Sequence, residues 1–184
     1  MRDRLHSRTM TIETFETGEE TITVEGTLED KRFYASRAFS RDETVEPGFI
    51  HHLTVTMTLA LPKLEIMNIE AAMPVIPHAE CAEIRDAVKR LRHIVIKHGF
   101  TDEVQRCFGK TQGCIHMMNL ILAMGSAAVQ GMWTYYARKK TDRQARTPDV
   151  DETMLLDSCW VWRKEGPFVK RLMNKKKQPD AGEE

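Results

Sequence analysis

The alternation of apolar and polar positions is most regular between residues 53 and 61. Every second residue there is apolar, and threonine or alanine fills the positions between. The apolar row is Leu53, Val55, Met57, Leu59 and Leu61. Strict alternation is typical of a β-strand with one buried face. The segment therefore predicts a strand whose apolar row points into the core.

Similar but shorter patterns predict further strands around this one. The predicted strands cover residues 9–15, 21–28, 31–37, 53–61 and 64–69. Thr17-Gly18-Glu19 separates the first two as a hairpin turn, and Pro62-Lys63 turns the chain between the last two. Pro74 and Pro77 are expected to end the strand region, because proline cannot donate to a sheet.

Beyond Pro77 the apolar spacing becomes that of helices. The predicted helices cover residues 78–96, 101–108 and 114–139, with one or two amphipathic helices over 151–174. The first has an apolar stripe at Ile84, Val88, Leu91 and Val95. Gly99 and Gly109 follow the first two helices as stops. The polar segment 140–150 predicts a linker.

The order of these elements indicates the fold class. Strands followed by helices indicate an α+β fold, with an N-terminal antiparallel sheet of four to five strands and the helices packed on one face. A chain of 184 residues suits a single domain. We expect a flexible arm at 1–8, one α+β domain over 9–174 and a disordered tail over 175–184.

Composition narrows the classes of partner. The chain has 27 basic and 27 acidic residues, so its formal net charge is zero and it has no general attraction to nucleic acid or an anionic membrane. The basic runs at 138–140 and 170–177 are expected to be solvated. No unbroken apolar run reaches the roughly 18–20 residues that span a bilayer. We therefore expect a cytoplasmic protein with a protein partner and no membrane segment.

The four cysteines include no CxxC pair, so reduced thiols are expected rather than a disulphide framework. Cys107 and Cys159 are expected in the core. Cys114 follows Gly113 at the start of the longest predicted helix, where the helix dipole favours a thiolate. A thiolate suits a nucleophile or a metal ligand, with His116 two residues away. The alternative is a small residue that packs at a helix start.

Two further residues have ambiguous patterns. Cys81 lies in the first turn of the first predicted helix, where a buried core cysteine is the alternative to a ligand. His51 is in phase with the inward row of the 53–61 strand, so it needs a partner. That partner can be a hydrogen-bonding group or a metal ion.

These positions suggest one site although none of their spacings is that of a known zinc motif. His51, Cys81 and Cys114 each stand at the start of a predicted element. Element starts can converge at one end of a sheet. With His116 as the fourth ligand, or as a residue that supports a ligand, the set His51, Cys81, Cys114 and His116 would suit zinc or an iron–sulphur cluster.

A family resemblance rests on short motifs. They are Val24 to Lys31, Gly48 to His51, Cys81, Gly99-Phe100 and Gly113-Cys114-Ile115-His116. Over most of residues 9–135 the chain resembles the bacterial family called domain of unknown function 2889. That family has His-Asp in place of His51-His52 and Gly-Cys-Thr-His-Leu in place of the residues from Gly113 to Met117. Its name implies no function.

A more distant likeness is to NifU-type iron–sulphur scaffold domains. Those place one ligand before a strand, a second before a helix and a third at the start of a later long helix. His51, Cys81 and Cys114 are similar in order, with histidine in place of the first cysteine. The likeness implies a NifU/SufE-like fold and a bound metal or cluster.

Three functional hypotheses remain open on the sequence. The first is a metal-binding scaffold or accessory domain that holds zinc or an iron–sulphur cluster. The second is a thiol-dependent enzyme, with Cys114 as nucleophile and His51 or His116 as base. The third is a non-catalytic interaction domain in which these residues belong to the core.

Overall fold

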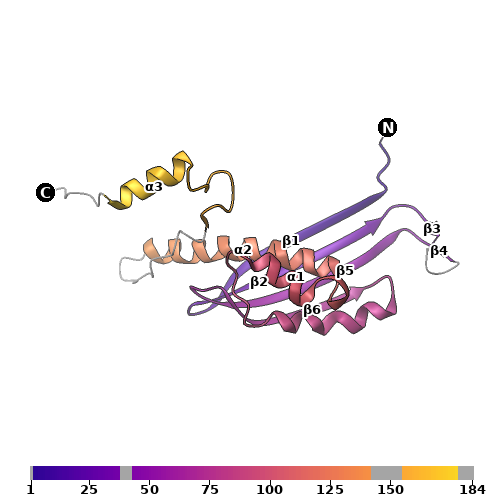
Figure 1. Cartoon of the computed structure of the whole chain (residues 1–184). Coiled ribbons are helices and arrows are strands. Elements are labelled where there is room, and N and C mark those ends of the chain that lie inside the picture. The colour runs from indigo at the N-terminus through magenta and orange to yellow at the C-terminus, as the bar shows by residue number, and fades with distance from the viewer. Residues whose placement is uncertain (1, 38–42, 142–154, 178–184) are drawn as a thin grey trace. The chain divides into compact units, whose positions relative to one another are not determined.

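The computed structural model describes residues 2–37, 43–141 and 155–177 (Figure 1). The chain divides into two compact units, Met1–Pro148 and Asp149–Glu184. The first unit contains every strand of the described residues, and the second contains helix α3 (Pro167–Lys177). The predicted linker and tail fall largely outside these ranges, at 142–150 and 178–184.

The first unit is built on a four-stranded antiparallel sheet. In chain order its strands are β1 (His6–Gly18), β2 (Thr21–Arg32), β5 (Gly48–Ala60) and β6 (Glu65–Val75), and they lie side by side in the order β1-β2-β5-β6. Two short strands, β3 (Ser36–Arg37) and β4 (Thr44–Val45), pair separately. The sheet and the helices that follow it confirm the predicted α+β class.

The register of the sheet aligns the apolar rows of its central strands. Leu53, Val55, Met57 and Leu59 on β5 are all 1% exposed or less. They pair with Leu28, Gly26, Val24 and Ile22 on β2. The threonines between the β5 residues point to the opposite face, as strand geometry requires. The predicted inward row of residues 53–59 is therefore the core row.

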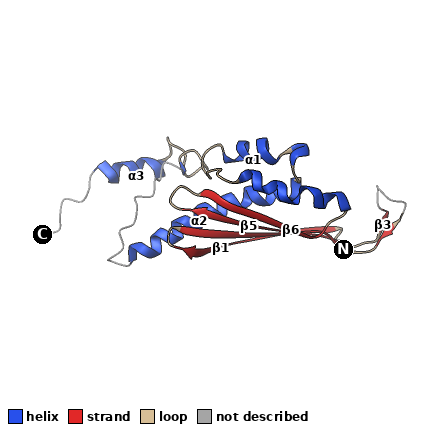
Figure 2. Ribbon diagram, turned by 90° about the horizontal axis from the view of Figure 1, so that it is seen from below, coloured by secondary structure: helices blue, strands red, loops and turns tan. Residues whose placement is uncertain are grey.

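The helices cover the face of the sheet that carries this row (Figure 2). Of these helices, η1 (Ala79–Leu91) and α2 (Ile115–Thr141) contact the strands. Helix α1 (Phe100–Phe108) packs on η1 and α2, and η2 (Lys110–Gln112) adjoins α1. Helix α2 lies closest to β2, where Gly26 makes room for it. A Cβ atom on Gly26 would lie 2.7 Å from Sδ of Met124.

Several boundaries differ from those expected. Strand β1 begins at His6, inside the predicted arm, and β2 ends at Arg32, so residues 31–37 form no third strand in the main sheet. Strand β6 continues through Pro74, which an edge strand tolerates because one side of it needs no N–H donor. The first predicted helix consists of 3₁₀ turns and ends at Leu91.

Helix α2 is the one described helix whose length and composition would allow it to cross a membrane, over Ile115–Lys139 with a mean hydropathy of 1.2. Core helices of globular domains have the same composition. The buried residues of α2 include Leu120 and Met124, which approach Gly26 of β2. This helix therefore supplies much of the core over the sheet. The expectation of no membrane segment stays a prediction.

Candidate functional site

The candidate site begins as one row of residues across three strands. Arg8 of β1 pairs with Asp30 of β2, and Asp30 pairs with His51 of β5. Asp30 and His51 form the next pair on the face of the sheet that carries the buried pair Leu28 and Leu53. Charged and polar side chains thus continue the apolar row at one end of the core.

Asp30 lies at the centre of this row and is only 2% exposed. Its Oδ1 accepts a hydrogen bond from Arg8 Nε at 2.7 Å, and its Oδ2 accepts one from Arg8 Nη2 at 2.7 Å. His51 Nδ1 lies 2.9 Å from Oδ2, and His6 Nε2 lies 3.3 Å from Oδ1. A buried charge of this kind is stable only when it is paired and hydrogen-bonded, as it is here.

The charge state of Asp30 fixes the proton on His51. The hydrogen bonds from Arg8 lower the pKa of the Asp30 carboxyl to about 2, against the opposing effect of burial. An ionised carboxylate can only accept hydrogen bonds. The proton of a neutral His51 is therefore on Nδ1, and its Nε2 carries a free lone pair.

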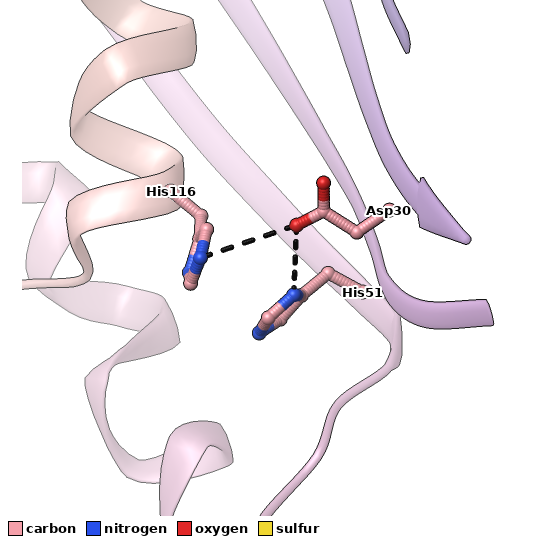
Figure 3. Close-up of side chains that lie close together, drawn as sticks. All are labelled: Asp30, His51 and His116. Atoms are coloured by element: carbon pink, nitrogen blue, oxygen red, sulfur yellow. Dashed lines mark hydrogen bonds and ion pairs between the residues drawn. The ribbon is translucent and has the colours of Figure 1, made fainter. Parts of the chain in front are cut away.

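His116 joins this row from the first turn of α2. Its ring lies against that of His51, with 3.9 Å between the ring centroids, and its Nε2 is 4.0 Å from Asp30 Oδ2 (Figure 3). Burial, followed by the charge on His51, lowers the pKa of His116. Burial also lowers the pKa of His51. Both imidazoles are thus favoured in their neutral form.

Cys114 stands immediately before α2, where its carbonyl oxygen accepts a hydrogen bond from the Met118 N–H at 2.8 Å. Its Sγ lies 3.8 Å from His116 Nδ1. The preceding Gly113 allows the chain to pass close to α1, because a Cβ atom there would collide with the carbonyl oxygen of Phe108. Gly113 therefore places both Cys114 and His116 beside the sheet.

Asp30, His51 and His116 form a group that can hold a metal ion. Each offers one ligand atom, and these atoms lie within 4.8 Å of one another. Tetrahedral bonds of about 2.0–2.2 Å to one ion would place the ligand atoms roughly 3.4 Å apart, so side-chain movements of about 1 Å are needed. It is the one such group of three or more residues in the described part of the chain.

The structure brings together two of the four residues expected from the sequence, His51 and His116, with Cys114 beside His116. Cys81 is half-buried in η1 and is not a member of the group Asp30, His51 and His116. Its assignment as a ligand stays a prediction, as does that of Cys114. Asp30 is not among the residues expected from the sequence, although it continues the alternate row Ile22, Val24, Gly26 and Leu28.

Comparison with known proteins gives one match. The family described as "Protein of unknown function (DUF2889)" matches residues 6–130, which include every residue of the group and both His6 and Arg8. The resemblance to this family is thereby confirmed. No curated protein and no solved structure matches the chain. The likeness to NifU-type domains stays a prediction.

Proposed function

We propose that this chain, which belongs to the DUF2889 family, binds one divalent transition-metal ion through Asp30, His51 and His116. The observation that carries the proposal is the convergence of three potential ligands from β2, β5 and α2 within 4.8 Å. Long-range pairing in the sheet and the start of a helix bring them together.

The protonation states support the proposal. A metal ion needs an ionised carboxylate and neutral imidazoles. Arg8 holds the pKa of Asp30 far below neutral, and burial lowers the pKa of both histidines. All three donors are therefore in the charge state that a metal needs at neutral pH, and ligation through the His51 Nδ1 that faces Asp30 moves the proton of that ring to Nε2.

The donor set favours a single ion over a cluster. Iron–sulphur clusters are held mainly by cysteine thiolates. Two imidazoles and a carboxylate suit zinc, and they also suit iron(II). Of the two cofactors expected from the sequence, zinc therefore agrees better with Asp30, His51 and His116. We propose a metal-binding accessory domain that acts with a protein partner in the cytoplasm.

Zinc titration of the full-length protein tests this proposal. Replacing either His51 or His116 by Gln removes one ligand, so zinc affinity should fall by about 100-fold or more. His93→Gln is the matched control, because His93 is 70% exposed and pairs with Glu65. Competition with a chromophoric chelator measures the zinc affinities of the wild-type protein and of the three variants. If His116→Gln and His93→Gln bind zinc equally well, the assignment is wrong.

A second candidate, a thiol-dependent enzyme, is favoured by the 3.8 Å separation of Cys114 Sγ and His116 Nδ1. A nucleophile and its base must lie about this close. In this function Cys114 would be alkylated well below pH 8, faster than the exposed Cys159. Mass spectrometry after a timed reaction with iodoacetamide compares the two thiols. Equal or slower reaction at Cys114 would remove this candidate.

A further inference from the structure

The three proposed ligands leave part of a metal ion's coordination sphere to another group. We propose that the metal centre takes an oxyanion, a carboxylate or a phosphate, as an exchangeable ligand, with Arg8 as its positioning cation. The inference rests on the proposed metal site and names the class of molecule that the site would bind.

The number of donors is the first argument. Structural zinc sites are usually closed by four protein ligands, whereas sites with three keep a position for water or substrate. The described group has three members. Solvent also reaches it, since His51 is 14% exposed and His116 is 25% exposed. A small molecule can therefore approach the ion from the side of the imidazoles.

The charge balance is the second argument. The fixed charges that act on His51 and His116 are those of Asp30 and Arg8. Asp30 and Arg8 cancel, so a bound divalent ion leaves the centre with an excess of about two positive charges. An anion in the open position reduces this excess, whereas a neutral ligand does not.

The N–H donors of Arg8 also favour an anionic ligand. A guanidinium has five N–H groups, and its planar fork matches the geometry of carboxylate and phosphate. Two of the Arg8 donors bind Asp30. The Arg8 side chain is 36% exposed, so donors remain for a second oxyanion beside the ion. Arg8 would then bridge the carboxylate of Asp30 and the incoming anion.

Cobalt(II) provides the test, because its visible absorption reports on coordination. Full-length protein is loaded with cobalt(II) and titrated separately with acetate, inorganic phosphate and neutral acetamide. We expect a saturable spectral change with acetate or phosphate and none with acetamide. The anion that binds with the higher affinity identifies the class of ligand. Equal responses to acetate and acetamide, or none to either anion, would overturn the inference and leave metal binding intact.

Two variants test whether Arg8 binds the anion. Arg8→Met should weaken anion binding to the cobalt-loaded protein by about tenfold, and Arg8→Lys should weaken it less. Lys89→Met is the control, because it removes the same charge from an exposed pair with Asp86 on η1. Unchanged anion affinity in Arg8→Met would overturn the role of Arg8. If the wild-type protein takes up no cobalt, both the metal site and the anion site are wrong.

Discussion

Asp30 combines burial with contacts to one arginine and two histidines. It lies under the sheet's helical layer at 2% exposure, and its carboxylate contacts Arg8, His51 and His6. Arg8 supplies the permanent charge that keeps Asp30 ionised. Asp30, Arg8 and His51 therefore form an organised cluster, because the carboxylate also orients the His51 ring.

Replacing Asp30 should change the pH dependence of stability. The pKa of Asp30 is lowered from 3.8 to about 2 in the folded protein. Its stabilising effect is thus fully present above about pH 4 and is lost as the pH falls toward 2. In the presence of a chelator, Asp30→Asn should lower the free energy of unfolding by about 2 kcal/mol at pH 7, and by less at pH 3.

Urea unfolding at both pH values measures this effect. Asp86→Asn serves as the control, since Asp86 is 61% exposed and pairs with Arg85 and Lys89 on η1. A loss of stability in Asp30→Asn that is the same at pH 7 and pH 3 would show that the ionised carboxylate is not its source.

At the scale of single residues, the sequence predicts part of the site. The phase of His51 with Leu53 could be read from the alternation, and the same reading applied to Leu28 would have found Asp30. The contact between His51 and His116 could not be predicted. It depends on where α2 begins relative to β5, and 64 residues of chain separate the start of α2 from His51. No local pattern records such a distance.

Among the elements, helix α2 has the largest effect on the site. Its first turn carries His116, and two of the glycines in or just before it lie against other elements at different points along the helix. Gly113 lies against the carbonyl oxygen of Phe108, and Gly131 lies against the β-branched side chain of Thr14 on β1. The first contact places the start of the helix beside the proposed metal ligands, and the second places the other half of the helix against β1.

Replacing each of these two glycines by alanine should distinguish an effect on folding stability from an effect on zinc affinity. Both changes force a Cβ into occupied space, so each should lower the free energy of unfolding by about 1–3 kcal/mol. Gly113→Ala should also weaken zinc binding, because it displaces His116. Gly131→Ala should leave zinc affinity unchanged. Urea unfolding and zinc titration of both variants give the comparison, and equal zinc affinities would show that the start of α2 does not position the ligand.

The elements themselves were predictable to different degrees. The hairpin of β1 and β2 and the strand β5 follow from alternation and turn residues. The segment after Pro77 has a helical stripe, but it folds as 3₁₀ turns, and the following chain instead pairs with β6, where Val95 bridges Glu65. Tertiary contacts with β6 decide that conformation, and local spacing does not contain them.

In the molecule as a whole, the site lies within the part that defines the family. Residues 6–130 match DUF2889, and the first compact unit contains all of them. The sheet, the start of α2 and the three proposed ligands therefore belong to one unit. The second unit, Asp149–Glu184, supplies none of the ligands and lies beyond the matched residues.

X-ray absorption at the zinc edge of the zinc-loaded, full-length protein tests the central claim most directly. Ligation by Asp30, His51 and His116 predicts a shell of nitrogen and oxygen at about 2.0–2.2 Å, with the outer scattering of two imidazole rings. A sulphur shell at about 2.3 Å would contradict this ligand set and show that a cysteine, Cys114 or Cys81 in the first place, is a ligand.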